Sequence, residues 1–398
     1  MINANAKKLC YNINRLNKIL YGQLLLATSL LYRIGSNYSI ERDSDCWSCK
    51  YIRGGSIILK KVFALMVCFS VMCGAAWGEV EINATNFPDE IFRTYVSKNF
   101  DGDSDGILGD SEIAAITSVD VANKGISDIT GIKNFTYLEI LRCSDNGLTQ
   151  MDVSNMQTLQ AVYCSYNSLE SLNVFGCRNL KLLQCDNNSL KSLNISGCSH
   201  LTHLYCYRNE LNSLDVSSNT ALMYLRCQGN NIAVLNVKNN TALKKLYCSS
   251  NSLAELDLTN NKALQDLSCG YNAMKALDLS NNTALTSVNV SSQSIGSLKV
   301  NRREDGTYYV DLMSDYGLTS QNLARVATSG VKGFNTKNNN VLTAYDSASG
   351  IASFSESPVK FLYGYDTGAG YSMDVTITAV PVITTEAQIG RASCRERV

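Results

Sequence analysis

A cysteine recurs every 21 residues through the middle of the chain, and this period constrains the fold more than any other feature. A leucine stands five residues before each of these cysteines, and an asparagine stands three residues after it. A fixed period of this length is typical of a solenoid, in which each repeat stacks only on its neighbours. The column consists of Cys143, Cys164, Cys185, Cys206, Cys227, Cys248 and Cys269.

The residue types within one repeat fit a short strand followed by a turn. Leu and Cys alternate in the strand, so both point inward from it. The asparagine follows where the chain turns, and its amide can satisfy buried backbone groups from coil to coil. A second apolar pair, such as Leu214 and Val216, fills the convex side.

The pattern LxxLxCxxNxLxxL resembles the leucine-rich repeat, with Cys at a position where that family usually has Leu. The resemblance covers about residues 116–300 and implies a right-handed coil with a parallel concave sheet. The first repeat, 116–137, is similar to internalin repeats, although Lys124 replaces the asparagine. We count nine coils, about 40 Å of stacked strands. In the last coil Val290 and Gln293 replace both Cys and Asn, which indicates the end of the array.

The cysteines are interpreted as core residues, because free Cys behaves as a small buried hydrophobe. One thiolate per coil does not make a tetrahedral metal site. Cys177 and Cys198 occupy equivalent places in neighbouring coils, within reach of a disulfide, and the sequence leaves open whether they are bonded. A lone CxxC, Cys46 to Cys49, lacks a second pair and is weak evidence for zinc or redox chemistry.

Both ends of the chain contain segments that we expect to lie outside the mature fold. Residues 59–78 carry two lysines, an apolar run and small residues near the end, a pattern that predicts a secretory signal peptide. Because a signal peptide stands at the start of a precursor, we expect translation to start at Leu59 and residues 1–58 to be a spurious upstream extension. Residues 389–398 match one reading frame of a sequencing adapter, so we expect them to be an artefact.

Residues 79–115 are predicted to form a helical cap with a calcium-binding loop of the EF-hand type. The stretch DGDSDGILGDSE places carboxylates, a turn glycine at Gly106 and a backbone carbonyl at the spacing of that loop. The alternative is a solvated acidic turn. Because no second loop is present to pair with it, we expect bound calcium to be structural. The predicted ligands are Asp101, Asp103, Asp105, Ile107 and Glu112.

No catalytic constellation appears in the sequence, and we predict that the chain is not an enzyme. Its only histidines are His200 and His203, and it has neither a nucleotide-binding loop nor a nucleophile elbow. The formal net charge is zero with 18% charged residues, which argues against a nucleic-acid partner. A recurring Asp at 152, 215, 257 and 278 falls on repeat turns and is interpreted as structural.

The outward positions of the concave strands are rich in Tyr and Arg. These residue types are enriched at binding hot spots, and stacked tyrosines also suit the faces of sugars. The alternative is that exposed aromatic residues on strands reflect β-propensity. Tyr166, Arg208 and Tyr271 lie just beyond this set. The predicted ligand-binding residues, for a protein or glycan, are Arg142, Tyr163, His203, Tyr205, Tyr207, Tyr224, Arg226, Lys245 and Tyr247.

Residues 301–388 are predicted to form a small β-rich domain that caps the solenoid, with a helix at 320–328. Together these features predict a secreted or cell-surface bacterial binding protein, similar to an adhesin. One alternative is a targeting module of a larger secreted enzyme, and another is a structural protein of the cell envelope. Contact with a membrane is expected only through the signal peptide or an anchor beyond this sequence.

Overall fold

The structure is a computed structural model that describes residues 38–43, 46–51 and 79–381. The chain divides into two units, Met1–Trp77 and Gly78–Val398. In the first unit β1 (Tyr38–Asp43) and β2 (Cys46–Tyr51), which contains the CxxC, form an antiparallel hairpin. The predicted signal peptide, the predicted start and the adapter-like end lie outside the described residues. Among the described residues, no helix is long and apolar enough to cross a membrane.

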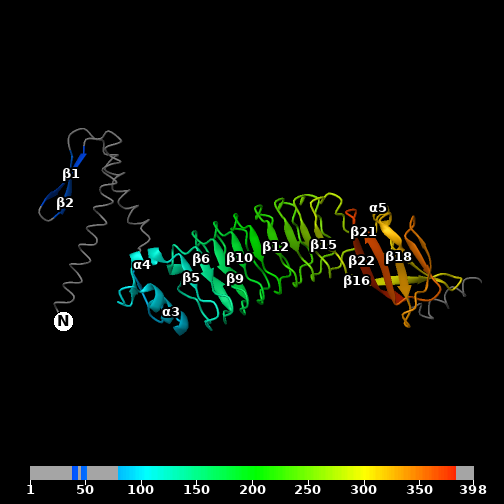
Figure 1. The fold of residues 1–398 in the computed structure, drawn as a ribbon, viewed down its shortest axis with the longest axis horizontal. Helices are drawn as coiled ribbons and strands as arrows, with labels where there is room; N and C mark the ends of the chain where they lie inside the picture. Colours follow the sequence, from blue (N-terminus) through cyan, green and yellow to red (C-terminus); the bar gives the residue numbers. More distant parts are fainter. Residues whose placement is uncertain (1–37, 44–45, 52–78, 382–398) are drawn as a thin grey trace, which may run out of the picture. The chain divides into compact units, whose positions relative to one another are not determined.

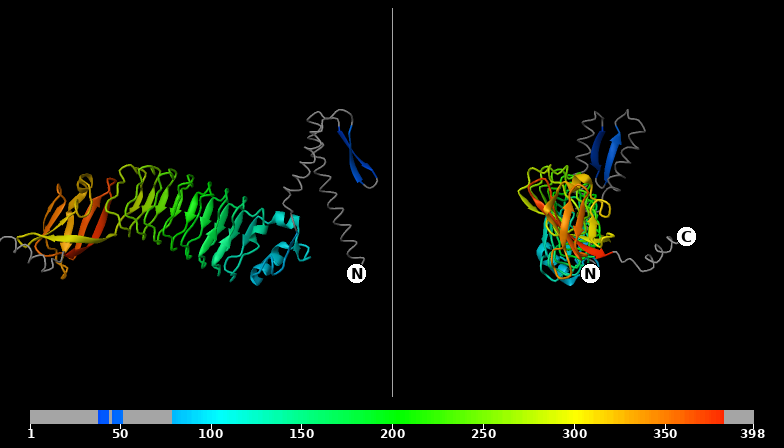
Figure 2. Two further views of the ribbon diagram at one scale, coloured as in Figure 1. Left: turned by 180° about the vertical axis from the view of Figure 1, so that it is seen from behind. Right: turned by 90° about the vertical axis from the view of Figure 1, so that its right-hand side faces the viewer.

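The second unit is built around a parallel sheet that has nine strands within the described residues (Figures 1 and 2). Each strand contains three residues and pairs with the equivalent residues of the next coil, so that Leu183 lies opposite Leu204. This is the predicted leucine-rich-repeat solenoid. Its strands are β5 (Ser118–Asp120), β6 (Ile140–Arg142), β8 (Ala161–Tyr163), β10 (Leu182–Gln184), β11 (His203–Tyr205), β12 (Tyr224–Arg226), β13 (Lys245–Tyr247), β14 (Asp266–Ser268) and β15 (Ser287–Asn289).

The solenoid core consists of columns of identical or similar residues. The middle residue of each strand points inward, and the cysteine that follows the strand does the same: Leu204 and Cys206 are both completely buried. The first and third residues of each strand point outward. The two-residue alternation therefore separates a uniform core from a variable concave face.

The asparagine column connects the coils as predicted. The Nδ2 group of Asn188 donates to the carbonyl of Cys164 in the preceding coil (3.0 Å) and to that of Cys185 in its own coil (3.1 Å). Its Oδ1 accepts the backbone N–H of Leu169 (2.9 Å). Gln293, which we expected to mark the loss of this column, makes the same bonds to Cys269 and Val290 through Nε2. The column therefore continues through the last coil.

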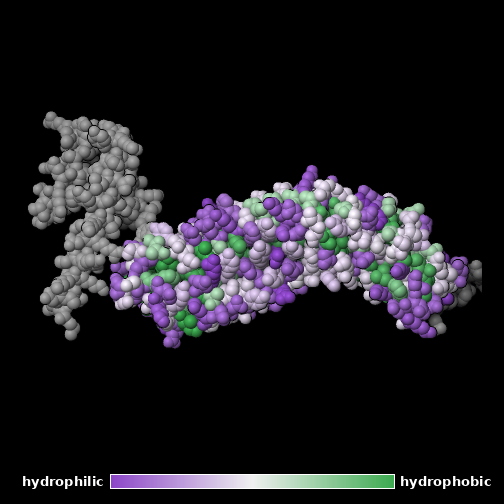
Figure 3. Space-filling view, in the orientation of Figure 1, coloured by the Kyte–Doolittle hydropathy of each residue, from purple (hydrophilic) through white to green (hydrophobic). Residues whose placement is uncertain are grey.

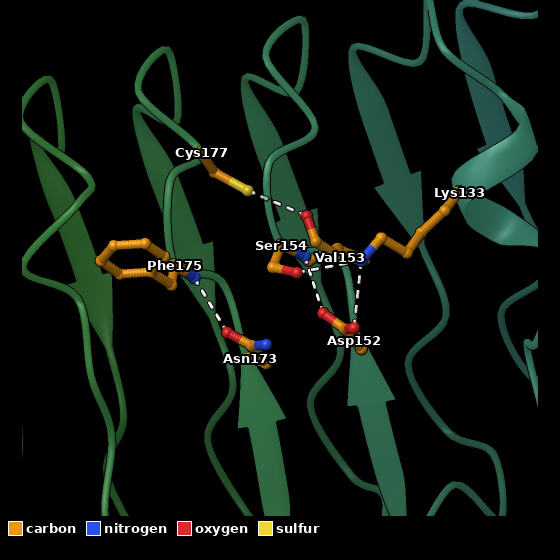
Figure 4. A network of polar contacts seen from close by, with 7 residues as sticks. All are labelled: Lys133, Asp152, Val153, Ser154, Asn173, Phe175 and Cys177. Atoms are coloured by element: carbon orange, nitrogen blue, oxygen red, sulfur yellow. Dashed lines mark hydrogen bonds and ion pairs between the residues drawn. The ribbon is translucent and has the colours of Figure 1, made fainter. Parts of the chain in front are cut away.

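Opposite the concave sheet, the turns are closed by a second polar column. β7 (Gln150–Asp152) and β9 (Ser171–Asn173) pair in parallel, and each is followed by a turn in which the Asp or Asn side chain accepts the N–H two residues ahead (Figure 4). These turns confirm that the recurring Asp is structural. The column consists of Asp152, Asn173, Asn194, Asp215, Asn236, Asp257 and Asp278.

Cys177 and Cys198 are not bonded to each other; both are free and buried. Their thiols instead donate to the carbonyls of Val153 (3.0 Å; Figure 4) and Val174 (3.4 Å). In the next coil Asn219 stands at the equivalent position, and its Nδ2 donates to the equivalent carbonyl, that of Ile195. The two cysteines therefore act as hydrogen-bond donors in the column that asparagine occupies later.

The N-terminal cap covers the open edge of β5. It contains β3 (Val80–Glu81), β4 (Ile107–Leu108), and the helices α3 (Glu90–Phe100) and α4 (Asp110–Ala115), and the first coil adds a 3₁₀ turn, η1 (Ile132–Asn134). Phe87, Phe92 and Phe135 pack against one another. The hydroxyl of Tyr95 accepts the N–H of Asp120 at the strand edge (3.3 Å). This contact satisfies a backbone donor that the first strand would otherwise leave unpaired.

The C-terminal domain is a seven-stranded sheet, in the order β18-β21-β22-β16-β17-β20-β19. It contacts the last coils through Tyr363, whose hydroxyl donates to the Lys275 carbonyl (2.8 Å), and through an Arg325–Asp278 ion pair (3.0 Å). The predicted helix at 320–328 is shorter: α5 ends at Leu323, and a strand begins at Val326. The elements are β16 (Gln293–Arg302), β17 (Tyr308–Asp311), α5 (Ser320–Leu323), β18 (Val326–Phe334), β19 (Leu342–Asp346), β20 (Ile351–Phe354), β21 (Lys360–Asp366) and β22 (Ser372–Pro381).

Candidate functional site

The concave sheet brings the predicted ligand-binding residues together in two outward columns. The first residues of the strands contribute His203, Tyr224 and Lys245, and the third residues contribute Arg142, Tyr163, Tyr205, Arg226 and Tyr247. Tyr207 directly follows the buried Cys206 and is partly exposed. Because the strands pair in parallel without a shift, residues in one column lie side by side along the solenoid. The nine residues therefore belong to one surface.

Arg226 is held between two tyrosines. Its guanidinium carbon lies 5.5 Å from the ring centre of Tyr205 in the preceding coil and 4.9 Å from that of Tyr247 in the following coil. Both distances are within the range of a cation–π contact. Arg142 makes the same contact with Tyr163 (5.2 Å). The faces of these three rings are thus directed at cations along the solenoid axis.

His203 and Tyr224 form a second stacked pair in the other column. Their ring centres are 4.4 Å apart and their planes differ by 9°. The hydroxyl of Thr202 lies 2.9 Å from Nδ1 of His203. Burial lowers the pKa of His203 from its ordinary value of 6.5, which favours the neutral imidazole. This pair contributes flat, uncharged surface beside the arginine.

Two carboxylates at the site were not identified from the sequence. Asp186 is completely buried and accepts from the Ser165 hydroxyl and the Asn187 amide (2.7 Å each). Burial raises the pKa of Tyr207, and its hydrogen bond to Asp186 raises it further. Asp266 pairs with Lys245 (2.7 Å). The prediction from sequence favoured Tyr and Arg residues, so both aspartates were passed over. Only their positions in the outward columns could have indicated that they belong to the site.

The charge that remains on this face is positive. Among the described residues, no carboxylate lies within ion-pair distance of Arg142, Arg208 or Arg226. Asp186 and Asp266 are already engaged by neighbouring side chains. In the view of Figure 3 hydrophilic and intermediate residues cover most of the solenoid surface. The site is therefore polar, aromatic and cationic.

The acidic loop of the cap brings together part of the predicted metal set. Ligand atoms of Asp101, Asp103 and Asp105 lie within 4.8 Å of one another. Asp101 is nearly buried and accepts the N–H groups of Asp105 (3.2 Å) and Gly106 (3.1 Å). Ile107, the predicted carbonyl ligand, lies in β4 and pairs with Glu81 of β3. The loop is therefore stabilised by a strand from its own cap.

Glu112 does not belong to this group of mutually close oxygens. Its Oε1 accepts the N–H of Gly102 (2.7 Å), and its Oε2 accepts that of Gly109 (2.8 Å). Both carboxylate oxygens of Glu112, a predicted metal ligand, thus accept backbone N–H groups within the loop. The arrangement has the oxygen chemistry that calcium prefers, with three carboxylates from alternate positions.

Acid should weaken the turn at Asp257. Its carboxylate accepts from the Thr259 hydroxyl (2.6 Å) and N–H (3.0 Å) and pairs with Lys238 (3.1 Å), which lowers its pKa from 3.8 to about 2. Because the folded pKa is the lower one, this stabilisation is present above pH 4 and is lost as the pH falls towards 2. Comparing urea unfolding of the wild type and Asp257→Asn from pH 6 to 2.5 should show a shallower pH dependence in the variant. Parallel curves would contradict the assignment.

The cysteine column does not supply a reactive group. Burial raises the pKa of Cys143, Cys227 and Cys269 to about 12. A thiol with such a pKa is protonated at neutral pH and is a poor nucleophile or metal ligand. These cysteines therefore act as core residues, as the sequence predicted.

Comparison with known proteins found similarity to one part of a bacterial protein and to several solved structures. No protein-family model matches the chain. A 68-residue stretch is 37% identical to Internalin J of Listeria monocytogenes serotype 4b (strain F2365) and represents 17% of this chain and 7% of that protein. The matched segment is thus a small fraction of the relative's length.

Solved structures of similar fold include two from the same species. The functional domain of InlJ from Listeria monocytogenes, described as including a cysteine ladder, is 19% identical over 76% of this chain and 99% of that chain, with a TM-score of 0.34. Internalin C2 of Listeria monocytogenes is 22% identical over 53% of this chain and 97% of that chain, with a TM-score of 0.47. The fold assignment rests on the nine coils described above, which form a leucine-rich-repeat solenoid.

Proposed function

We propose that the chain is a non-catalytic binding module that captures a protein partner on its concave face. The observation that carries the proposal is the Arg226 guanidinium between Tyr205 and Tyr247. Arg and Tyr are among the residue types that most often dominate the binding energy of protein interfaces. They occupy a rigid sheet at outward positions that the core does not constrain.

The orientation of the rings favours a protein over a glycan. Sugar rings bind to the open face of an aromatic side chain, but Tyr205 and Tyr247 direct ring faces at Arg226, and Tyr224 stacks on His203. Each of these rings thus has one face engaged by a neighbouring side chain, and the tyrosine hydroxyls and guanidinium N–H groups belong to the same surface. These groups suit directional hydrogen bonds with polar side chains and backbone carbonyls.

Replacing Tyr205, Arg226 and Tyr247 together by Ala is expected to weaken partner binding at least about 100-fold, because truncation of one hot-spot residue costs about 2 kcal/mol or more. The measurement is binding of the full chain to arrays of immobilised extracellular proteins and, in parallel, of glycans, followed by affinity determination for each hit. Circular dichroism and thermal unfolding should be unchanged, since the three side chains lie outside the core.

A matched control replaces Phe175, Lys191 and Val234 by Ala. These residues are also exposed, but they lie outside the concave columns. The control should bind as the wild type does. Equal affinity of the concave variant and the wild type would reject the proposed site, and hits confined to the glycan array would reject the protein partner.

We also propose that the loop at residues 101–112 binds a structural calcium ion. The three aspartates would hold the ion, and Gly106, with φ of +79°, permits the sharp turn between them. The bound ion would neutralise the repulsion among the carboxylates. Since the loop is paired with β3 and precedes the first coil, its order would support the docking of the cap.

Removing calcium with a chelator is expected to lower the melting temperature by about 4 °C, because ligand at about 100 times its Kd adds about 2.7 kcal/mol. Asp103→Asn should abolish this response without lowering the stability of the metal-free protein, since it relieves repulsion. Glu170→Gln, an exposed change away from the loop, should respond as the wild type does. A melting temperature that is indifferent to calcium in the wild type would remove the metal proposal.

Secretion through the segment at 59–78 and display at the cell surface also belong to this proposal. A partner captured by an exposed concave face must share a compartment with the module. The test is fractionation of the bacterium that expresses the chain, with N-terminal sequencing of the mature protein. A cytoplasmic protein with an intact segment 1–78 would contradict it.

A further inference from the structure

Each coil of the solenoid contains one residue in the left-handed conformation, two positions beyond the cysteine column or its equivalent. The φ angles at this position range from 52° to 66°. We refer to the position as the rim, because it follows the concave strand where the chain turns. The rim residues are Asn123, Asp145, Tyr166, Asn187, Arg208, Gly229, Ser250, Tyr271 and Ser292.

Five rim residues are neither Gly, Asn nor Asp, and three of these five have large side chains. Left-handed backbone is adopted readily by Gly and, among other residues, most readily by Asn and Asp, whereas bulky side chains are disfavoured there. Tyr166, Arg208 and Tyr271 nevertheless have φ angles of 52–54°, the same as Asn123 and Asn187. The backbone does not relax to accommodate them.

The structure gives these side chains no compensating role in folding. Tyr166 and Tyr271 are 53% and 62% exposed, and Arg208 is exposed as well. Among the described residues, none of the three side chains makes a hydrogen bond or an ion pair. Strained backbone that no interaction of the side chain compensates is found most often at functional sites.

The rim borders the concave site directly. Arg208 follows Tyr207, and Tyr166 follows Ser165, the partner of buried Asp186. Gly229, the rim residue of the next coil, has no side chain and leaves the side of Arg208 open. Arg208 and Arg226 come from consecutive coils, and neither has an ion-pair partner among the described residues.

We propose that Tyr166, Arg208 and Tyr271 determine the specificity of the concave site for a protein partner with an acidic surface. This inference rests on the proposed function and adds the chemistry of the partner. The arginines provide charge-assisted hydrogen bonds to Asp and Glu side chains. The exposed tyrosines, two coils before and three coils after Arg208, provide hydroxyl donors and flat apolar area along the same rim.

Three variants of the full chain test the proposal: Tyr166→Asn, Arg208→Asn and Tyr271→Asn. Asn is the residue that this column already uses at positions 123 and 187, so each variant is expected to melt at an equal or higher temperature, by about 2–4 °C where strain is relieved. The probe is immobilised poly-L-glutamate, with poly-L-lysine and heparin in parallel. Arg208→Asn should weaken poly-L-glutamate binding about ten-fold, and each tyrosine variant should weaken it to a lesser degree.

The matched control is Ser250→Asn, a rim residue that is neither aromatic nor charged. It should gain stability in the same way and keep wild-type binding. Rim variants that melt at lower temperatures than the wild type, or that bind poly-L-glutamate equally well, would overturn the proposal, and so would binding to heparin alone. If the triple concave variant loses binding while the rim variants retain it, only the rim inference fails; if the triple variant also retains binding, the proposed function fails.

Discussion

Replacing Asn209 by Ala is expected to lower the free energy of unfolding by about 3–5 kcal/mol, because several buried backbone groups lose their partners at once. Asn209 Nδ2 donates to the carbonyls of Cys185 (3.0 Å) and Cys206 (3.2 Å), and its Oδ1 accepts the N–H of Leu190 (3.0 Å). The side chain is only 8% exposed, so water does not replace these bonds. The change interrupts the ladder in the middle of the array.

Urea unfolding followed by circular dichroism measures this loss. The control is Asn212→Ala in the same coil, where the side chain is exposed and the effect should stay within about 0.5 kcal/mol. Asn209→Asp, which keeps an acceptor for Leu190 but removes the donor, should be destabilised as well. A loss below about 1 kcal/mol for Asn209→Ala would show that the ladder is not a principal source of stability.

The asparagine column was predictable from the sequence because the same residue type recurs with the period of the repeat. Gln293 was misjudged for the same reason: it breaks the residue pattern, yet one extra methylene lets its amide reach the carbonyls of Cys269 and Val290. Cys177 and Cys198 illustrate the opposite error. Their spacing fits a disulfide, but only the positions of the Val153 and Val174 carbonyls show that the thiols replace an amide donor.

At the concave face the period predicted which residues point outward but not how they contact one another. The contact of Arg226 with two tyrosines depends on side-chain torsions that residues in adjacent coils determine jointly. The burial of Asp186 could not be predicted for a related reason, since the sequence does not show that neighbours cover a single acidic residue in an outward column. In the cap, the motif predicted the three aspartates, whereas the bonds of Glu112 to Gly102 and Gly109 required coordinates.

The junction between the cap and the first coil depends on a glycine. Gly131 has φ of +102°, and a Cβ atom at this position would lie 2.5 Å from the carbonyl oxygen of Asn86 and 2.5 Å from Cδ1 of Phe87. Phe87 is completely buried and stacks on Phe135 at 6.2 Å, so its ring has little room to move. Close approach of the cap backbone to the first coil is therefore possible only without a side chain at residue 131.

Gly131→Ala is expected to lower the free energy of unfolding by about 2–5 kcal/mol, the sum of about 1–2 for the left-handed backbone and about 1–3 for overpacking. Gly125→Ala is the matched control: its φ is +74°, but nothing lies within 4 Å of the added Cβ, so it should lose only the conformational part. Urea unfolding measures both variants.

A double-mutant cycle with Phe87→Leu isolates the steric part. The leucine should cost less in the Gly131→Ala background than in the wild type, because it removes the ring atoms that the new Cβ meets. Equal losses for Gly131→Ala and Gly125→Ala, with no coupling to residue 87, would mean that the cap can shift away from the coil. The cap would then be held by its strand and Tyr95 contacts rather than by close packing at Gly131.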